Sequence, residues 1–176
     1  MPIAPPPPCP APPPGDEHYL EQVLALAERS RREGHHPFAA LVVAADGQVL
    51  AEAMNDSRSD RTAHAEMNAL RSASSRHRPA ELATATLYSS AEPCAMCAGG
   101  AYWTGIGRVV YALSEASLLA LTGSDPENPT LSLPCRDIFA RGQRPIEVIG
   151  PLREDEARRA HVGFWQMPSE AGRLPR

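Results

Sequence analysis

The sequence contains no lysine, and all 17 of its basic residues are arginine. Schiff-base enzymes and P-loop nucleotide-binding proteins both need a lysine, so these two classes are excluded. The formal net charge is −4, whereas proteins that follow a nucleic-acid backbone usually carry a basic face. The charge balance therefore disfavours nucleic acid as a partner, although it leaves room for a local arginine patch.

Long apolar runs are also missing. No stretch of about 18 apolar residues is present to span a bilayer, and the N-terminus has neither the charged start nor the apolar block of a signal peptide. Four cysteines in 176 residues are too few for a disulfide framework. These absences predict a cytoplasmic protein with no membrane partner, in a reducing compartment where cysteines are free to bind metal.

Proline is concentrated at the N-terminus, where it makes up nine of the first 14 residues. Proline has no N–H to donate to a sheet or to a helix interior. We therefore expect residues 1–15 to form a disordered or polyproline-type tail. Residues 16–176 fit a single domain with one core, because typical domains contain about 100 to 200 residues.

Apolar periodicity and turn signals predict alternating helices and strands in the rest of the chain. Asp46 and Gly47 separate two short apolar runs and favour a β-hairpin, Thr62 is placed to cap a helix, and Pro93 to open another. The segment 118–135, rich in Pro, Asn, Asp and Ser, is expected to be mostly loop. The predicted fold is a three-layer α/β/α sandwich around a mixed five-stranded sheet. Its helices cover residues 17–33, 62–76, 93–105 and 154–165, and its strands cover 38–44, 48–54, 86–89, 108–113 and 146–149.

Two cysteines and one histidine are spaced as ligands of a single metal ion. Cys94 and Cys97 are three positions apart, so on a helix both sulfurs lie on one face, and the helix N-terminus after Pro93 favours thiolates. His64 lies at the start of the preceding predicted helix. An N,S,S set leaves the fourth position of a tetrahedral zinc open, as in catalytic sites. A structural zinc site with Cys135 as fourth ligand is the alternative.

Glu66 follows His64 by two positions, so on a regular helix its side chain points away from the ligand direction. It can then take a proton from a water molecule at the open position and pass it to a leaving amine. Taken singly, a buried acid and a C-x-x-C pair both have ordinary structural explanations. Together, H-A-E followed by P-C-A-M-C matches the H-x-E…P-C-x-x-C signature of zinc deaminases that act on nucleobases.

At these residues the sequence resembles the cytidine deaminase-like superfamily, and within it the bacterial guanine deaminases, tRNA adenosine deaminases and fungal-type cytosine deaminases. The resemblance is carried by HPFAALVV from His36, by TAHAEMNAL from Thr62 and by SSAEPCAMCAGGAYWTGIGRVVY from Ser89. It implies the cytidine deaminase-like fold, a homodimer and one zinc ion per subunit. The implied zinc ligands are His64, Cys94 and Cys97, and Glu66 is the implied proton shuttle.

The same resemblance implies four contacts to the substrate. Asn55 would hydrogen-bond the ring edge, and Phe38, after a proline as in guanine deaminases, would stack on a purine. Asp125 follows the metal motif at about the place of a second acidic contact, and Ala65 completes the set. The alternatives are that Asn55 is a strand-end residue and that Asp125 forms a turn.

The predicted reaction is zinc-dependent hydrolytic deamination of a small purine or pyrimidine, most of all guanine to xanthine and ammonia. The alternatives are A-to-I editing of tRNA adenosine and deamination of cytosine or cytidine, because the machinery is shared. An RNA substrate needs a basic groove beside the pocket, for which Arg136, Arg141 and Arg144 are the nearby candidates. A noncatalytic binding module is a further alternative, which the intact Glu66 disfavours. Phe164 and Trp165, where the resemblance fades, would either close the pocket or pack into the core.

Overall fold

Residues 15–123 and 125–165 are described by the computed structural model of the protein. The proline-rich tail predicted over residues 1–15 lies outside the described residues, except for Gly15. None of the helices in the described part of the chain has the length and apolar character that crossing a membrane requires.

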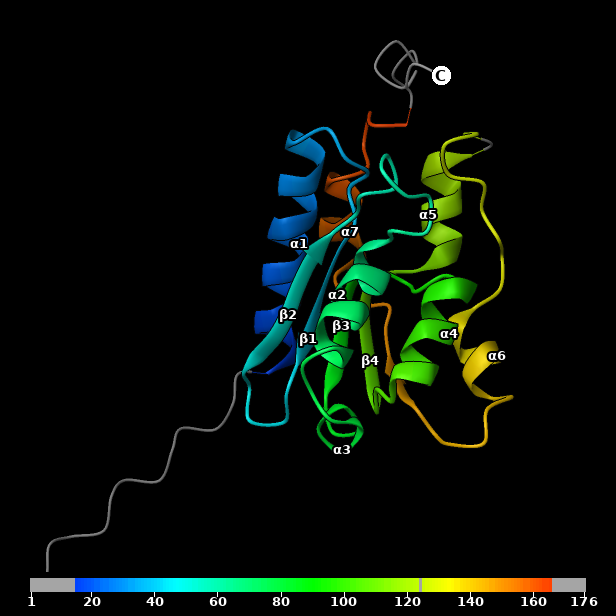
Figure 1. The fold of residues 1–176 in the computed structure, drawn as a ribbon. Helices are drawn as coiled ribbons and strands as arrows, with labels where there is room; N and C mark the ends of the chain where they lie inside the picture. The colour runs from blue at the N-terminus through cyan, green and yellow to red at the C-terminus, as the bar shows by residue number, and fades with distance from the viewer. Residues whose placement is uncertain (1–14, 124, 166–176) are drawn as a thin grey trace, which may run out of the picture.

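Five strands form one mixed sheet in the order β2-β1-β3-β4-β5 (Figure 1). β1 (Ala39–Val43) pairs antiparallel with β2 (Val49–Met54) and with β3 (Thr86–Ala91). β4 (Arg108–Leu113) and β5 (Glu147–Ile149) continue the sheet parallel to β3. The predicted hairpin and the mixed five-stranded sheet are therefore confirmed, and β3 extends two residues further than predicted.

Helices cover both faces of this sheet and form the predicted three layers (Figure 1). Alternate residues of β1 face opposite cores: Leu41 packs with helices α1 and α7, and Val42 packs with α2, α4 and α6. All five positions of β1 are buried, as expected for a strand covered on both sides. The helices are α1 (Asp16–Arg32), α2 (Ala65–Ser74), α3 (Pro79–Leu82), α4 (Ala95–Thr104), α5 (Glu115–Thr122), α6 (Cys135–Phe139) and α7 (Glu154–Arg159).

The segment 118–135 is not mostly loop at its start, because α5 occupies Glu115–Thr122. The Ser114 side chain caps this helix by accepting from the Ser117 N–H, and the sequence EASLLALT consists largely of good helix formers. The turn-forming residues that guided the prediction are found only after Gly123. α6 then begins at Cys135.

Two helix ends and one short helix also differ from the prediction. Thr62 does not cap α2, because its hydroxyl donates to the Asp60 carboxylate, and His64 is the N-cap residue. The last helix ends at Arg159 rather than at residue 165, and Gly163 in the following turns has φ +70°. The short α3 was not predicted.

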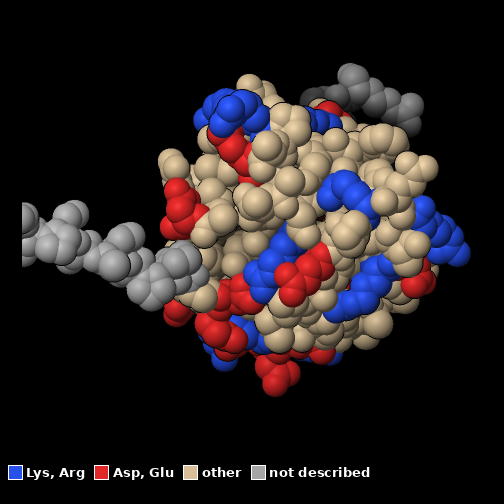
Figure 2. Space-filling view, turned by 90° about the horizontal axis from the view of Figure 1, so that it is seen from below, with Lys and Arg blue, Asp and Glu red and all other residues tan. Residues whose placement is uncertain are grey.

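The start of α1 is tied to the sheet by an ion pair. Both carboxylate oxygens of Asp16 accept from the Arg108 guanidinium at 2.7 Å, and Tyr88 donates to the same carboxylate at 2.7 Å. The hydrogen bonds from Arg108 hold the pKa of Asp16 below its ordinary value of 3.8. Figure 2 views the molecule from below, where α1 begins, and shows acidic and basic side chains interspersed rather than a basic patch.

We expect Asp16→Asn to lower the free energy of unfolding at pH 7 by about 1–3 kcal/mol, because the two charge-assisted bonds are lost. A carboxyl group with a depressed folded-state pKa stabilises above its unfolded pKa and loses that contribution as the pH falls through the folded value. The difference between wild type and variant should therefore shrink below about pH 4, as measured by urea unfolding at several pH values. Glu33→Gln, which removes the partner of the 56% exposed Arg29, is the control and should leave the stability close to that of wild type, because exposed ion pairs contribute little. Equal stability of Asp16→Asn and wild type at pH 7 would contradict this role.

Candidate metal centre and active site

Three potential metal ligands from the N-terminal ends of two helices meet in space. His64 is the N-cap of α2, Cys94 is the N-cap of α4, and Cys97 lies in the first turn of α4. His64 Nδ1, Cys94 Sγ and Cys97 Sγ are each 3.6 Å from the other two. A tetrahedral zinc with Zn–S bonds of about 2.3 Å and Zn–N bonds of about 2.0–2.1 Å has ligand separations of about 3.6–3.8 Å. The three atoms therefore have the spacing that zinc requires.

The electrostatics of this cluster favour a cation. Cys94 Sγ and Cys97 Sγ form a hydrogen-bond contact at 3.6 Å, and this contact lowers the pKa of Cys94 to about 4. The same contact, together with burial, raises the pKa of Cys97, and the hydrogen bond to Cys94 raises the pKa of His64. The donor set thus carries thiolate charge that a divalent metal would neutralise.

Glu66 lies beside the cluster in the first turn of α2. Its side chain is buried, with Oε2 3.5 Å from Cys97 Sγ, and its Oε1 accepts from Ser89 Oγ at 2.8 Å. Burial raises the pKa of Glu66, as is common for groups that exchange protons. Ser89 was not identified as a functional residue from the sequence, because its partner Glu66 lies 23 positions away in the chain.

Glu92, in the loop that leads to Cys94, connects this loop to the starts of two helices. This buried carboxylate accepts from the backbone N–H of Glu115, at the start of α5, at 3.1 Å, and from that of Cys135, at the start of α6, at 3.0 Å. A negative charge at a helix N-terminus is favourable. Cys135, the alternative fourth ligand, is buried at the start of α6 and is not part of the described three-residue cluster.

The family model for the cytidine and deoxycytidylate deaminase zinc-binding region matches residues 14–113, which include the three potential ligands and Glu66. The chain belongs to this family. A probable cytosine deaminase of Schizosaccharomyces pombe is 40% identical over 151 residues, which cover 85% of this chain and 92% of the relative. A tRNA-specific adenosine deaminase of Haemophilus influenzae is 36% identical over 57% of this chain and 59% of its own length. The solved structure of guanine deaminase from Nitrosomonas europaea aligns with TM-score 0.68 and 29% identity, over 87% of this chain and 86% of that one.

Two of the residues predicted to contact the substrate, Asn55 and Ala65, are held by backbone contacts close to the potential metal ligand His64. Asn55 is buried at the end of β2, and the next N–H, of Asp56, donates at 2.9 Å to the carbonyl of Ala63, which precedes His64. Ala65 is the fully buried first residue of α2. Both residues are thus held next to the segment that carries His64.

The other two predicted substrate contacts, Phe38 and Asp125, are further in sequence from the potential metal ligands. Phe38 is half-buried, with its ring centroid 5.1 Å from that of His161 and 6.0 Å from that of Trp165. Asp125 is half-exposed, and its Oδ1 accepts from the Glu127 N–H at 2.9 Å. That bond is the turn geometry that was the alternative interpretation of Asp125.

The described C-terminal end of the deaminase packs onto these aromatic rings. Trp165 is 8% exposed, its Nε1 donates to His161 Nδ1 at 3.2 Å, and its ring lies 5.1 Å from that of His36. Trp165 was expected either to close the pocket or to pack into the core, and its burial matches packing into the core. Burial lowers the pKa of His161 to about 4, so this imidazole is neutral at pH 7.

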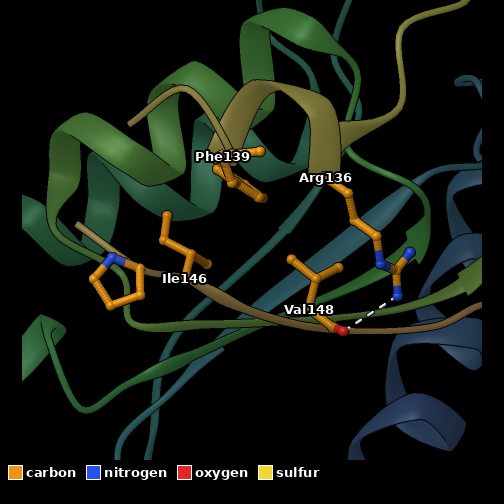
Figure 3. A pocket seen from close by; sticks show the side chains of 6 residues that line it. Arg136, Phe139, Ile146 and Val148 are labelled. Atoms are coloured by element: carbon orange, nitrogen blue, oxygen red, sulfur yellow. Dashed lines mark hydrogen bonds between the residues drawn. The ribbon is translucent and has the colours of Figure 1, made fainter. Parts of the chain in front are cut away.

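The three arginines that were candidates for binding RNA donate to protein oxygens instead. Arg136 binds Tyr111 Oη and the carbonyls of Val148 and Gly150, and it lines a cavity of about 330 Å³ between α6 and β5 (Figure 3). Arg144 donates to carbonyls near the C-terminal end of α4, and Arg141 donates to the Asp137 carbonyl. All three side chains thus form hydrogen bonds within the deaminase. The residues that line the cavity belong neither to the metal cluster nor to the predicted substrate contacts.

Proposed function

We propose that this protein is a zinc-dependent aminohydrolase that deaminates a free nucleobase, with guanine as the first candidate, giving xanthine and ammonia. The observation that carries the proposal is the buried Glu66 carboxylate beside a three-ligand cluster with zinc spacing. Three protein ligands leave one position of a tetrahedral ion for a reacting water, which is the arrangement of catalytic rather than structural zinc.

The roles of the side chains follow from this geometry. Zinc bound by His64, Cys94 and Cys97 would supply the Lewis acidity that makes water a nucleophile at neutral pH. Glu66 takes a proton from the attacking water and delivers protons to the ring nitrogen and the leaving amine, so that ammonia departs and a carbonyl remains. Ser89 holds Oε1 of Glu66 and thereby fixes which carboxylate oxygen faces the cluster.

Two observations support a free base. The chain aligns with a guanine deaminase structure over most of both molecules, and its candidate arginines donate to protein carbonyls, whereas an RNA substrate needs a basic groove beside the pocket. Phe38 supplies a half-buried ring of the type that stacks on a purine. Cytosine is the second candidate, because the probable cytosine deaminase of S. pombe matches over 92% of its length.

We further propose one zinc ion per subunit and a homodimer. Trp103 is 84% exposed on α4, the helix that carries two of the metal ligands. In the proposed homodimer, a contact through this part of α4 would bury the Trp103 side chain.

The decisive experiment is ammonia release from zinc-loaded protein with guanine, guanosine, adenine, adenosine, cytosine and cytidine, alongside a tRNA substrate. We expect release from guanine above all others. Release from cytosine alone would identify the second candidate, and release only from tRNA would replace the free-base proposal.

A further inference from the structure

The Asn55 side chain has a defined orientation, because Ser57 occupies its oxygen. Asn55 Oδ1 accepts from the Ser57 backbone N–H at 2.9 Å and from Ser57 Oγ at 2.8 Å. A backbone N–H can only donate, so the amide oxygen and not the nitrogen must face Ser57. Nδ2 is consequently the end of the amide that is available to a ligand.

His36 extends this chain of hydrogen bonds. Its Nδ1 lies 3.3 Å from Ser57 Oγ. Asn55 Oδ1 is the closer acceptor for the Ser57 hydroxyl, at 2.8 Å against 3.3 Å for His36 Nδ1. With the hydroxyl proton assigned to Asn55, Ser57 Oγ accepts from His36, and the proton of the neutral His36 ring is assigned to Nδ1. The order of donation is therefore from His36 to Ser57 to Asn55.

Both the backbone and the ring of His36 are held in place. The His36 backbone carbonyl accepts from the buried Ser30 hydroxyl of α1 at 2.7 Å. The His36 ring packs edge-on against Trp165 and Phe164 at centroid distances of 5.1 and 5.9 Å. Burial lowers the pKa of His36, against an opposing effect of Glu127, which is consistent with a neutral ring that carries one proton. The fixed ring can impose an orientation on its neighbours.

We propose that His36 is a positioning residue that, through Ser57 Oγ, reinforces the amide orientation set by the Ser57 N–H and so holds Asn55 Nδ2 toward the substrate. The site then selects rings that offer a hydrogen-bond acceptor to Asn55, either a carbonyl oxygen or an unprotonated ring nitrogen, and disfavours rings that offer an N–H there. This inference rests on the proposed function, in which Asn55 contacts the base.

The test compares His36→Ala, Ser57→Ala and the double variant with His77→Ala, a control histidine that faces Glu81 instead. We expect each single variant to raise KM about tenfold, the effect of one lost hydrogen bond, and to change kcat by less than about threefold. The double variant should be no worse than the more affected single variant, because both break one chain. His36→Asn, which keeps a donor near Nδ1, should restore KM to within about twofold of wild type.

The same series is measured for binding of guanine and cytosine by calorimetry in a Glu66→Gln background, where turnover does not interfere. A KM and Kd for His36→Ala equal to those for His77→Ala would overturn the inference, and so would a fall in kcat and melting temperature with unchanged KM. Ser57→Ala keeps the test available if His36→Ala fails to fold. If wild type releases ammonia from no base but the Glu66→Gln protein binds guanine or cytosine, the proposed function fails and the Kd series still decides the role of His36. Binding of neither base overturns both.

Discussion

Glu66→Gln should reduce kcat by about 10²- to 10⁴-fold, because general acid–base catalysis contributes about that much and an amide cannot accept and return the proton. Zinc content should be unchanged, since Glu66 is not one of the three residues in the ligand cluster. Binding of the base should also be retained within about threefold, because the loss is confined to the transition state. Ammonia release and zinc content of the same preparations measure all three effects.

Two further variants identify the cause of that loss. Ser89→Ala removes the hydrogen bond to Glu66 Oε1 and should lower kcat by about tenfold. Glu33→Gln makes the same chemical change as Glu66→Gln at the exposed end of α1 and should leave activity unchanged. A Glu66→Gln variant that retains more than about a tenth of wild-type kcat would show that another group transfers the proton.

Cys97→Ala should abolish both zinc binding and activity. Removing one of three ligands leaves only His64 and Cys94 to hold the ion. The folded state then loses the stabilisation that metal binding provides. We expect zinc content to fall from about one per chain to near zero and the melting temperature to fall by about 5 °C or more. Elemental analysis after desalting and a thermal melt measure both.

Cys135→Ala is the matched control, because Cys135 is also a buried cysteine at the start of a helix. It should keep its zinc and its activity and lose only about 1–2 kcal/mol of stability. Loss of zinc from Cys135→Ala would instead establish a four-ligand structural site, and full zinc in Cys97→Ala would show that this thiol is not a ligand.

The metal cluster was predictable because its ligands lie in two short motifs, and each motif begins a helix. Local spacing in H-A-E and C-A-M-C limits where His64, Cys94 and Cys97 can point, and the alternation of strands and helices brings the motifs to the same end of the sheet. The sheet was predictable for a similar reason: its apolar runs and its Asp46-Gly47 turn are local signals.

The supporting contacts were not predictable, because they join residues that are far apart in the sequence. Ser89 reaches Glu66 across 23 positions, and Arg108 reaches Asp16 across 92. Neither contact leaves a periodic or local mark in the sequence. α5 was missed because the prolines and turn residues that follow it dominated the composition of the segment, whereas its capping residue, Ser114, lies just before that segment.

The two hydrogen bonds accepted by Glu92 close the segment between Glu115 and Cys135 into a loop whose ends are fixed at one carboxylate. The entropic cost of closing a loop grows only slowly with its length, by about 0.6 kcal/mol for each doubling. Between α5 and α6, where most of the described residues are exposed, residues can therefore be exchanged, inserted or deleted while Cys94, on the adjoining turn, keeps its place. The segment is thus a natural position for grafting loops from other deaminases, so that substrate preference can be changed without rebuilding the metal centre.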